Sequence, residues 1–153
     1  MKRKHRLVLF SILSMLILCF IFGNSLLGKE QSGAKSSLVA DLLRPILDPK
    51  EKIPEDLFHH FVRKLAHFTE FAALGAALSW RLGMLEKRKF PALVYSFGTA
   101  CLDETIQLFV PDRGPAIRDV VIDTCGAAVG ILLLLLGEKT IGKIKTSKEN
   151  KTL

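Results

Sequence analysis

The sequence predicts an all-α membrane protein, a single small bundle of about four transmembrane helices with both termini in the cytoplasm. Of its 153 residues 49% are hydrophobic and 24% are charged, but the apolar residues are concentrated in four blocks. A spanning helix needs about 20 mostly apolar residues, and the four blocks approach or pass that length. Several ionisable residues lie inside these blocks, where such residues are costly and usually functional.

The first predicted span covers residues 7–23, which carry no charge, and it is the shortest unless it continues to Leu27. A basic stretch before an apolar run is also typical of a cleaved signal peptide, but this run is longer than most and no A-x-A site follows it. Residues 28–37 are rich in Ser, Gly, Lys and Gln and predict an exposed linker.

A short amphipathic segment is expected in the first outer loop, where Ser37 would cap a helix that ends or bends at Pro45. It would lie on the outer bilayer surface or pack on the mouth of the bundle. The other spans are predicted at residues 65–85, 90–110 and 119–137, and the second helix is expected to begin before the membrane, over residues 57–64. The Lys-rich residues 138–153 predict a solvated, partly disordered cytoplasmic tail.

Lysines and arginines near the helix ends set the expected orientation. With four spans, three basic clusters share the cytoplasmic side, so the first loop and the 111–118 turn face outward. The clusters are Lys2, Arg3, Lys4 and Arg6; Arg81, Lys87, Arg88 and Lys89; and Lys139, Lys143, Lys145, Lys148 and Lys151. The net charge of +7 therefore indicates membrane orientation and contact with anionic lipid. The sequence contains no motif of aromatic and basic residues that would indicate a nucleic-acid partner.

Polar residues inside the second and third spans predict a site. His67 and Glu70 follow Lys64 along one face of the second helix, because residues three and four apart are neighbours on a helix. In the third span, Asp103 and Glu104 are followed by Gln107. At least one of two adjacent acids in a span should be protonated, ion-paired or bound to a cation.

The connection to the fourth span is a tight, stiff turn that contains Pro111, Gly114 and Pro115. Arg113 and Arg118 would stand at the outer surface. The start of a helix favours a carboxylate, which explains Asp119 as an ordinary cap but does not explain Asp123, which lies four residues deeper.

Routine close packing of helices is the interpretation that we favour for a G-x-x-x-G motif in the fourth span, formed by Gly126 and Gly130. Because successive spans alternate in direction, the polar groups of three separate spans meet near the outer face of the membrane. This coincidence in depth predicts one polar site or one buried polar network.

The segments HFTEFAALG and DETIQLFVPDRGPAIRDVVIDTCGAAVG resemble the VanZ-like family of bacterial membrane proteins. The resemblance covers roughly residues 63–137, and the elements H-F-x-E-F, D-E-x-x-Q and R-G-P-x-x-x-D-x-x-x-D-x-x-G occur in order. It implies a small multi-pass protein of the bacterial cytoplasmic membrane, in a family some of whose members raise resistance to the glycopeptide teicoplanin. The matching motif positions are His67, Glu70, Asp103, Glu104, Gln107, Arg113, Asp119 and Asp123.

Three functions fit these residues. A binding module would engage a membrane lipid, an amphiphilic glycopeptide or an envelope precursor in the outer pocket. A membrane enzyme would use a general base, arginines that hold a phosphate or carboxylate, and an acid-bound divalent cation. A purely structural network would need every polar group satisfied, and it can coexist with binding. Four spans without a repeat argue against a transporter or channel.

The sequence favours the binding module and leaves catalysis, the cofactor, the metal and the oligomeric state open. The catalytic candidates are His67, Glu70, Asp103 and Glu104; the ligand-binding candidates are Lys64, Gln107, Arg113, Arg118, Asp119 and Asp123.

Overall fold

Five helices and no strand make up the part of the chain that a computed structural model describes, residues 3–86, 90–114 and 116–149. The helices are α1 (Arg3–Ser25), α2 (Lys29–Leu47), α3 (Glu55–Glu86), α4 (Phe90–Gln107) and α5 (Ile117–Glu149). The predicted all-α class is confirmed. Outside the described residues lie Lys2, Lys87, Arg88, Lys89, Pro115 and Lys151, and the side chains of residues 29, 84–86 and 142–149 are likewise not described.

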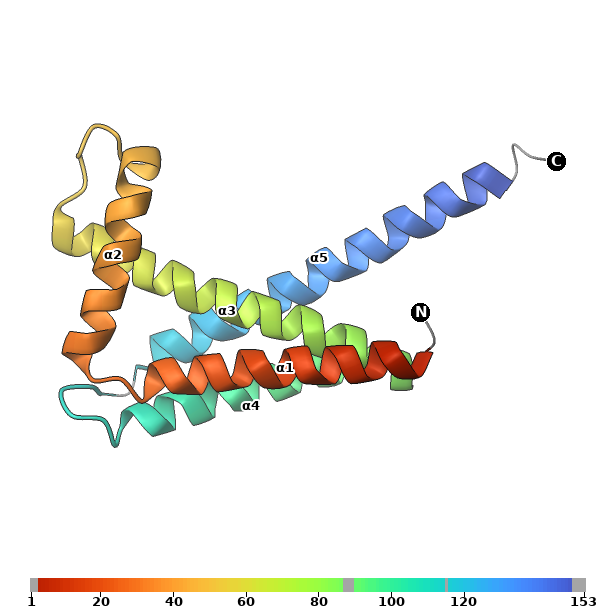
Figure 1. The fold of residues 1–153 in the computed structure, drawn as a ribbon, viewed down its shortest axis with the longest axis horizontal. Coiled ribbons are helices and arrows are strands. Elements are labelled where there is room, and N and C mark those ends of the chain that lie inside the picture. The colour runs from red at the N-terminus through yellow and green to blue at the C-terminus, as the bar shows by residue number, and fades with distance from the viewer. Residues whose placement is uncertain (1–2, 87–89, 115, 150–153) are drawn as a thin grey trace.

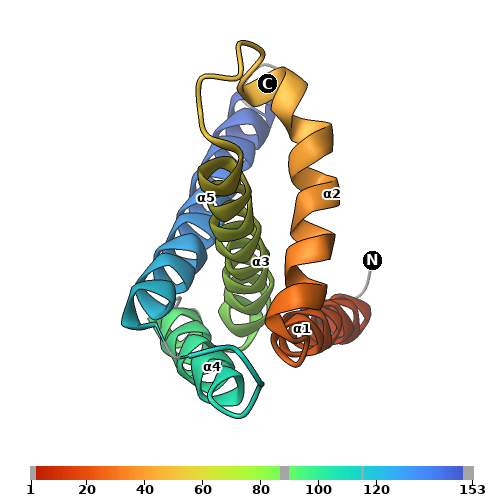
Figure 2. The same ribbon diagram turned by 90° about the vertical axis from the view of Figure 1, so that its left-hand side faces the viewer.

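Helix α3 is the centre of the arrangement and contacts each of the other four helices. Helices α1 and α4 run beside it, α5 crosses it obliquely, and α2 stands across one end of the bundle (Figures 1 and 2). The end of α1, the first half of α3, the end of α4 and the start of α5 therefore share that end of the bundle (Figure 1). The polar residues predicted to meet lie on these four segments.

Glycines bring the backbones of α3 and α5 into contact where the two helices cross. A Cβ atom on Gly130 would lie 1.9 Å from the Ala72 carbonyl oxygen, and one on Gly126 would lie 2.3 Å from that of Phe68. Gly75 makes the equivalent contact from α3, since a Cβ atom on Gly75 would lie 2.4 Å from the Ala127 carbonyl oxygen on α5. The G-x-x-x-G motif thus serves close helix packing, as expected.

The bundle buries polar side chains and exposes apolar ones. Its main core is small and is formed by Ile21, Phe71, Leu74, Ala100 and Ala127 from four helices. Buried polar residues accompany this core, and large apolar side chains cover the outer surfaces of α1, α4 and α5. Such continuous apolar surface is typical of a face that contacts a membrane or another protein.

Two of the described helices are long and apolar enough to cross a membrane by length and composition, Arg3–Ser25 and Ile117–Ile141. Helices α3 and α4 carry the ionisable residues of the predicted site, which lower their hydropathy. Helix α4 ends at Gln107, before the predicted boundary at residue 110, and α5 continues to Glu149, into the segment expected to be a partly disordered tail.

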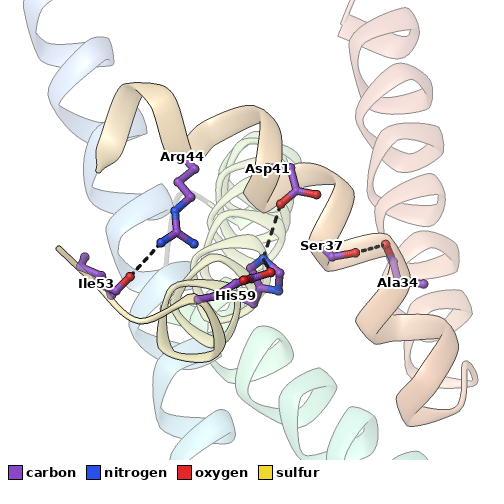
Figure 3. Close-up of polar contacts among 7 residues, drawn as sticks. Ala34, Ser37, Asp41, Arg44, Ile53 and His59 are labelled. Atoms are coloured by element: carbon purple, nitrogen blue, oxygen red, sulfur yellow. Dashed lines mark hydrogen bonds and ion pairs between the residues drawn. The ribbon is translucent and has the colours of Figure 1, made fainter. Parts of the chain in front are cut away.

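The predicted linker over residues 28–37 is wrong, because α2 already begins at Lys29. Ser37 does not cap the helix but donates to the Ala34 carbonyl oxygen inside it, at 2.9 Å (Figure 3). Pro45 lies in the last turn and does not end the helix, which runs to Leu47. Weak local helix propensity is overridden by packing on α3.

Helix α2 is held on α3 by apolar and polar contacts. Ala40 packs with Phe58 and Val62 of α3. Asp41 lies 3.6 Å from the His59 ring, and the Arg44 guanidinium donates to the Ile53 carbonyl oxygen at 3.0 Å (Figure 3). The expected segment in the first outer loop is therefore a full helix across the mouth of the bundle.

Asp48 closes the loop between α2 and α3. Its carboxylate accepts the backbone N–H groups of Lys52, at 3.0 Å, and Ile53, at 2.9 Å. These bonds, that of Ile53 above all, lower the pKa of Asp48, because they stabilise its charged form.

Candidate functional site

Three side chains from three helices converge at the shared end of the bundle. His67 comes from α3, Asp103 from α4 and Asp123 from α5. Each offers a ligand atom, and these atoms all lie within 4.8 Å of one another. Asp103 is 0% and Asp123 1% exposed. The close crossing of α3 and α5 brings Asp123 near His67, because Gly126, one turn after Asp123, lies against Phe68, the residue that follows His67.

Asp103 is fixed by neighbours from two helices. The Ser25 hydroxyl at the end of α1 donates to Asp103 Oδ1, and Gln107 Nε2, one turn along α4, donates to Oδ2 at 2.9 Å. Both oxygens of this buried carboxylate are therefore hydrogen-bonded and its orientation is set.

Asp123 differs from Asp103, since neither of its carboxylate oxygens has a hydrogen-bond partner among the residues that the structure describes. The same holds for His67 Nδ1 and Glu70 Oε2. Burying an ionised carboxylate without compensation costs several kcal/mol. The centre of the site is thus a set of buried polar atoms that remain available to a ligand.

Contacts at the rim tie the surrounding segments together. Lys64 on α3 forms an ion pair with Asp119 on α5 at 2.5 Å, and each side chain is about one-fifth exposed. Glu104 Oε2 accepts the backbone N–H of Ala116 at 2.6 Å, which fixes the α4–α5 turn against α4.

Arg113 in that turn is half-buried beside the carboxylates. Burial lowers the pKa of its guanidinium, as does the nearby Arg63, whereas Asp103 and Glu104 oppose the shift. Arg118 is exposed and joins neither the cluster nor the cavity described next. Of the predicted candidates, the structure gathers at this end His67, Glu70, Asp103, Glu104, Lys64, Gln107, Arg113, Asp119 and Asp123.

A cavity of about 420 Å³ adjoins the cluster between α1, α2 and α3. Its walls are mainly apolar and include Phe20, Leu38 and Val62, while His67 and Glu70 belong both to the cavity and to the polar end of α3. The basic residues Arg63 and Lys35 also line it.

Sequence analysis missed three residues of the site. Asn24 Nδ2 donates to Glu70 Oε1 at 3.4 Å, Ser25 donates to Asp103, and Arg63 lines the cavity with no partner for its buried Nε among the described residues. The sequence does contain a signal for Asn24 and Ser25. They end the first apolar block, at the same expected depth in the membrane as the acids of the other spans.

The described part of the chain is an all-α bundle with polar side chains inside and apolar ones outside, and two of its helices are able to cross a membrane. These features define the class of helical membrane proteins. The chain belongs to the VanZ/LLP1 family, whose sequence model matches residues 10–138. The predicted resemblance to VanZ-like proteins is thereby confirmed. Comparison with curated proteins and with solved structures finds no match.

Proposed function

We propose that this chain is a multi-pass protein of the bacterial cytoplasmic membrane that binds an envelope lipid or a lipid-tailed amphiphile at an outward-facing intramembrane site. Four helices, α1, α3, α4 and α5, span the membrane, and both termini are cytoplasmic. Through this site the protein contributes to cell-envelope defence, with teicoplanin as one candidate ligand. The resemblance to VanZ-like proteins supports this choice of ligand class.

The cavity is the observation that carries this proposal. About 420 Å³ falls in the range of small-molecule sites, which are mostly apolar with a few polar groups that fix orientation. Phe20, Leu38 and Val39 offer apolar surface to a hydrocarbon chain. Arg63, whose buried Nε lacks a partner among the described residues, and Lys35 suit an anionic headgroup such as a phosphate or carboxylate.

Binding of teicoplanin and of phosphatidylglycerol to the full chain in nanodiscs tests the proposal. In a phosphatidylcholine background, the Arg63→Gln, Lys35→Gln double variant should bind at least one of these probes about 10-fold more weakly, because one charge-assisted bond is worth about 1.5–3 kcal/mol. Arg118→Gln removes an exposed cation outside the cavity and should bind as the native chain does. Equal binding by all three proteins, or no binding by any, would refute the proposal.

A membrane enzyme is the second candidate function, favoured because His67 and Glu70 border both the cavity and the acidic cluster. A lipid held in the cavity would place its headgroup beside a general base. Mass spectrometry of envelope lipids incubated with the purified protein tests this candidate. A new lipid product that Glu70→Gln no longer forms would favour the enzyme over the binding module. Unchanged lipids would contradict the enzyme and favour the binding module.

A purely structural network is the weakest candidate. Such networks stabilise when every member is satisfied. Asp103 meets that requirement, whereas Asp123, Glu70 and His67 each keep a buried polar atom without a partner among the described residues.

A further inference from the structure

We propose that His67, Asp103 and Asp123 form a binding site for one divalent metal ion of the first transition row, such as Mn²⁺ or Zn²⁺. The three residues come from α3, α4 and α5, and their ligand atoms lie within 4.8 Å of one another. Ligand atoms that each lie about 2.0–2.2 Å from one ion are at most about 4.4 Å apart. Small side-chain rotations therefore complete the site without a change of fold.

Asp123 is the second and independent observation for this site. The side chain is 1% exposed and points into the cluster, and neither of its oxygens has a hydrogen-bond partner among the described residues. An ionised carboxylate in that position is strongly disfavoured unless a cation compensates its charge, and the alternative is that the group stays protonated. The nearby cation Lys64 is already paired with Asp119.

The donor set selects the class of ion. One imidazole nitrogen suits zinc, iron and similar metals, whereas carboxylate oxygens suit manganese and magnesium, so a mixed nitrogen and oxygen set favours Mn²⁺ or Zn²⁺ over Ca²⁺. Three protein ligands leave at least one coordination position for water or another ligand.

The surroundings of Asp103 resemble the support that metal ligands usually have. Ser25 and Gln107 each donate a hydrogen bond to this carboxylate, which sets its orientation and leaves further lone pairs for an ion. Such outer contacts orient metal ligands and commonly change metal affinity about 10- to 100-fold. The inference does not depend on lipid binding in the adjacent cavity.

Metal content of the full-length protein in nanodiscs tests the site. After loading with Mn²⁺ or Zn²⁺ and dialysis, the native chain should retain about one ion and Asp123→Asn should retain almost none. Asp112→Asn is the matched control, because Asp112 lies in the neighbouring turn, is exposed, and has a φ of 60° that asparagine tolerates. No retained ion in the native chain, or equal retention in Asp123→Asn, would overturn the proposal.

Pulsed electron paramagnetic resonance on the Mn²⁺-loaded native chain provides a test that does not depend on folding of the Asp123 variant. The spectrum should show coupling to an imidazole nitrogen, which should vanish in His67→Gln and persist in His59→Gln. His59 is the matched control, since it lies on the α2-facing part of α3 beside Asp41. A bound ion without nitrogen coupling, or coupling that survives His67→Gln, would refute the assignment.

Discussion

The two buried aspartates of the cluster differ in how their charges are accommodated. Asp103 accepts bonds from Ser25 and Gln107, whereas Asp123 accepts none from the described residues. A carboxylate with matched donors contributes to stability, while an uncompensated one reduces it. Substitution of the two residues should therefore have opposite effects on stability.

In metal-free protein held with a chelator at neutral pH, Asp123→Asn should raise the melting temperature by removing a carboxyl group that folding must desolvate or protonate, which costs about 1 kcal/mol or more. Asp103→Asn should lower it, because the amide offers a single, uncharged acceptor oxygen to the two donors Ser25 and Gln107. Thermal unfolding of both variants in the same detergent measures this contrast. A similar loss of stability in both would instead support the purely structural network.

Asp48 gives the loop between α2 and α3 a defined pH dependence. The N–H groups of Ile53 and Lys52 lower its pKa below the usual value of about 3.9, so its charge stabilises the folded loop. The contribution is complete above that usual value and is lost as pH falls through the lowered pKa. The native chain should thus unfold at higher temperature than Asp48→Asn at neutral pH, and the difference should shrink at acidic pH.

Melting curves of the two proteins between neutral and strongly acidic pH check this expectation. Asp56→Asn, at an exposed position in the first turn of α3, is the matched control and should keep its offset from the native chain within the usual small range for surface substitutions. A pH-independent difference for Asp48→Asn would contradict the role assigned to its charge.

The crossing of α3 and α5 positions the site, and it depends on glycine. Gly130→Ala would place a methyl group 1.9 Å from the Ala72 carbonyl oxygen, which the backbone of α3 cannot avoid without moving. We expect a loss of about 1–3 kcal/mol, the usual cost of overpacking. Gly137→Ala in the same helix meets nothing within 4 Å and should be neutral or slightly stabilising.

The effects of Gly130→Ala and Gly137→Ala are measured as the melting temperature and the amount of folded protein. If Gly130→Ala and Gly137→Ala behave alike, α3 and α5 do not approach as closely as the glycine contacts require.

Much of the helical plan was predictable from the sequence, because blocks of apolar residues specify helices strongly. Helix α2 shows where this fails. Its first residues are serine, glycine, lysine and glutamine, which indicate a linker locally, yet packing of Ala40 on Phe58 and Val62 favours one continuous helix. That stabilisation comes from a contact distant in sequence, which local propensity does not contain.

The candidate site was predictable to the extent that its chemistry is unusual in an apolar segment. Asp103 and Asp123 stood out because buried acids need an explanation. Asn24 and Ser25 did not, since neutral polar residues at a helix end are ordinary, and only the fold places them against Glu70 and Asp103. Arg113 and Arg118 were equal candidates in the sequence, since both flank the turn before the fourth span. In the structure Arg113 is half-buried, whereas Arg118 is exposed.

The proposed topology, four spans with both termini in the cytoplasm, requires that the α2–α3 loop face outward and that α5 emerge in the cytoplasm. In a chain whose three free cysteines are replaced by serine, Lys50→Cys should react with a membrane-impermeant maleimide added to intact cells. Lys139→Cys, on the exposed surface of α5, should react only after lysis. Reaction of both in intact cells, or of Lys139→Cys alone, would contradict the four-span topology.

Whether the cavity holds an amphiphile is best measured by native mass spectrometry of the intact chain released from detergent. Ala66→Trp fills the cavity that Ala66 lines, whereas Ala73→Trp adds the same bulk at an exposed position on the same helix. The native chain and Ala73→Trp should each retain about one lipid or added teicoplanin molecule, and Ala66→Trp should retain none. Equal retention by all three proteins, or no retention by the native chain, would contradict an amphiphile site between α1, α2 and α3.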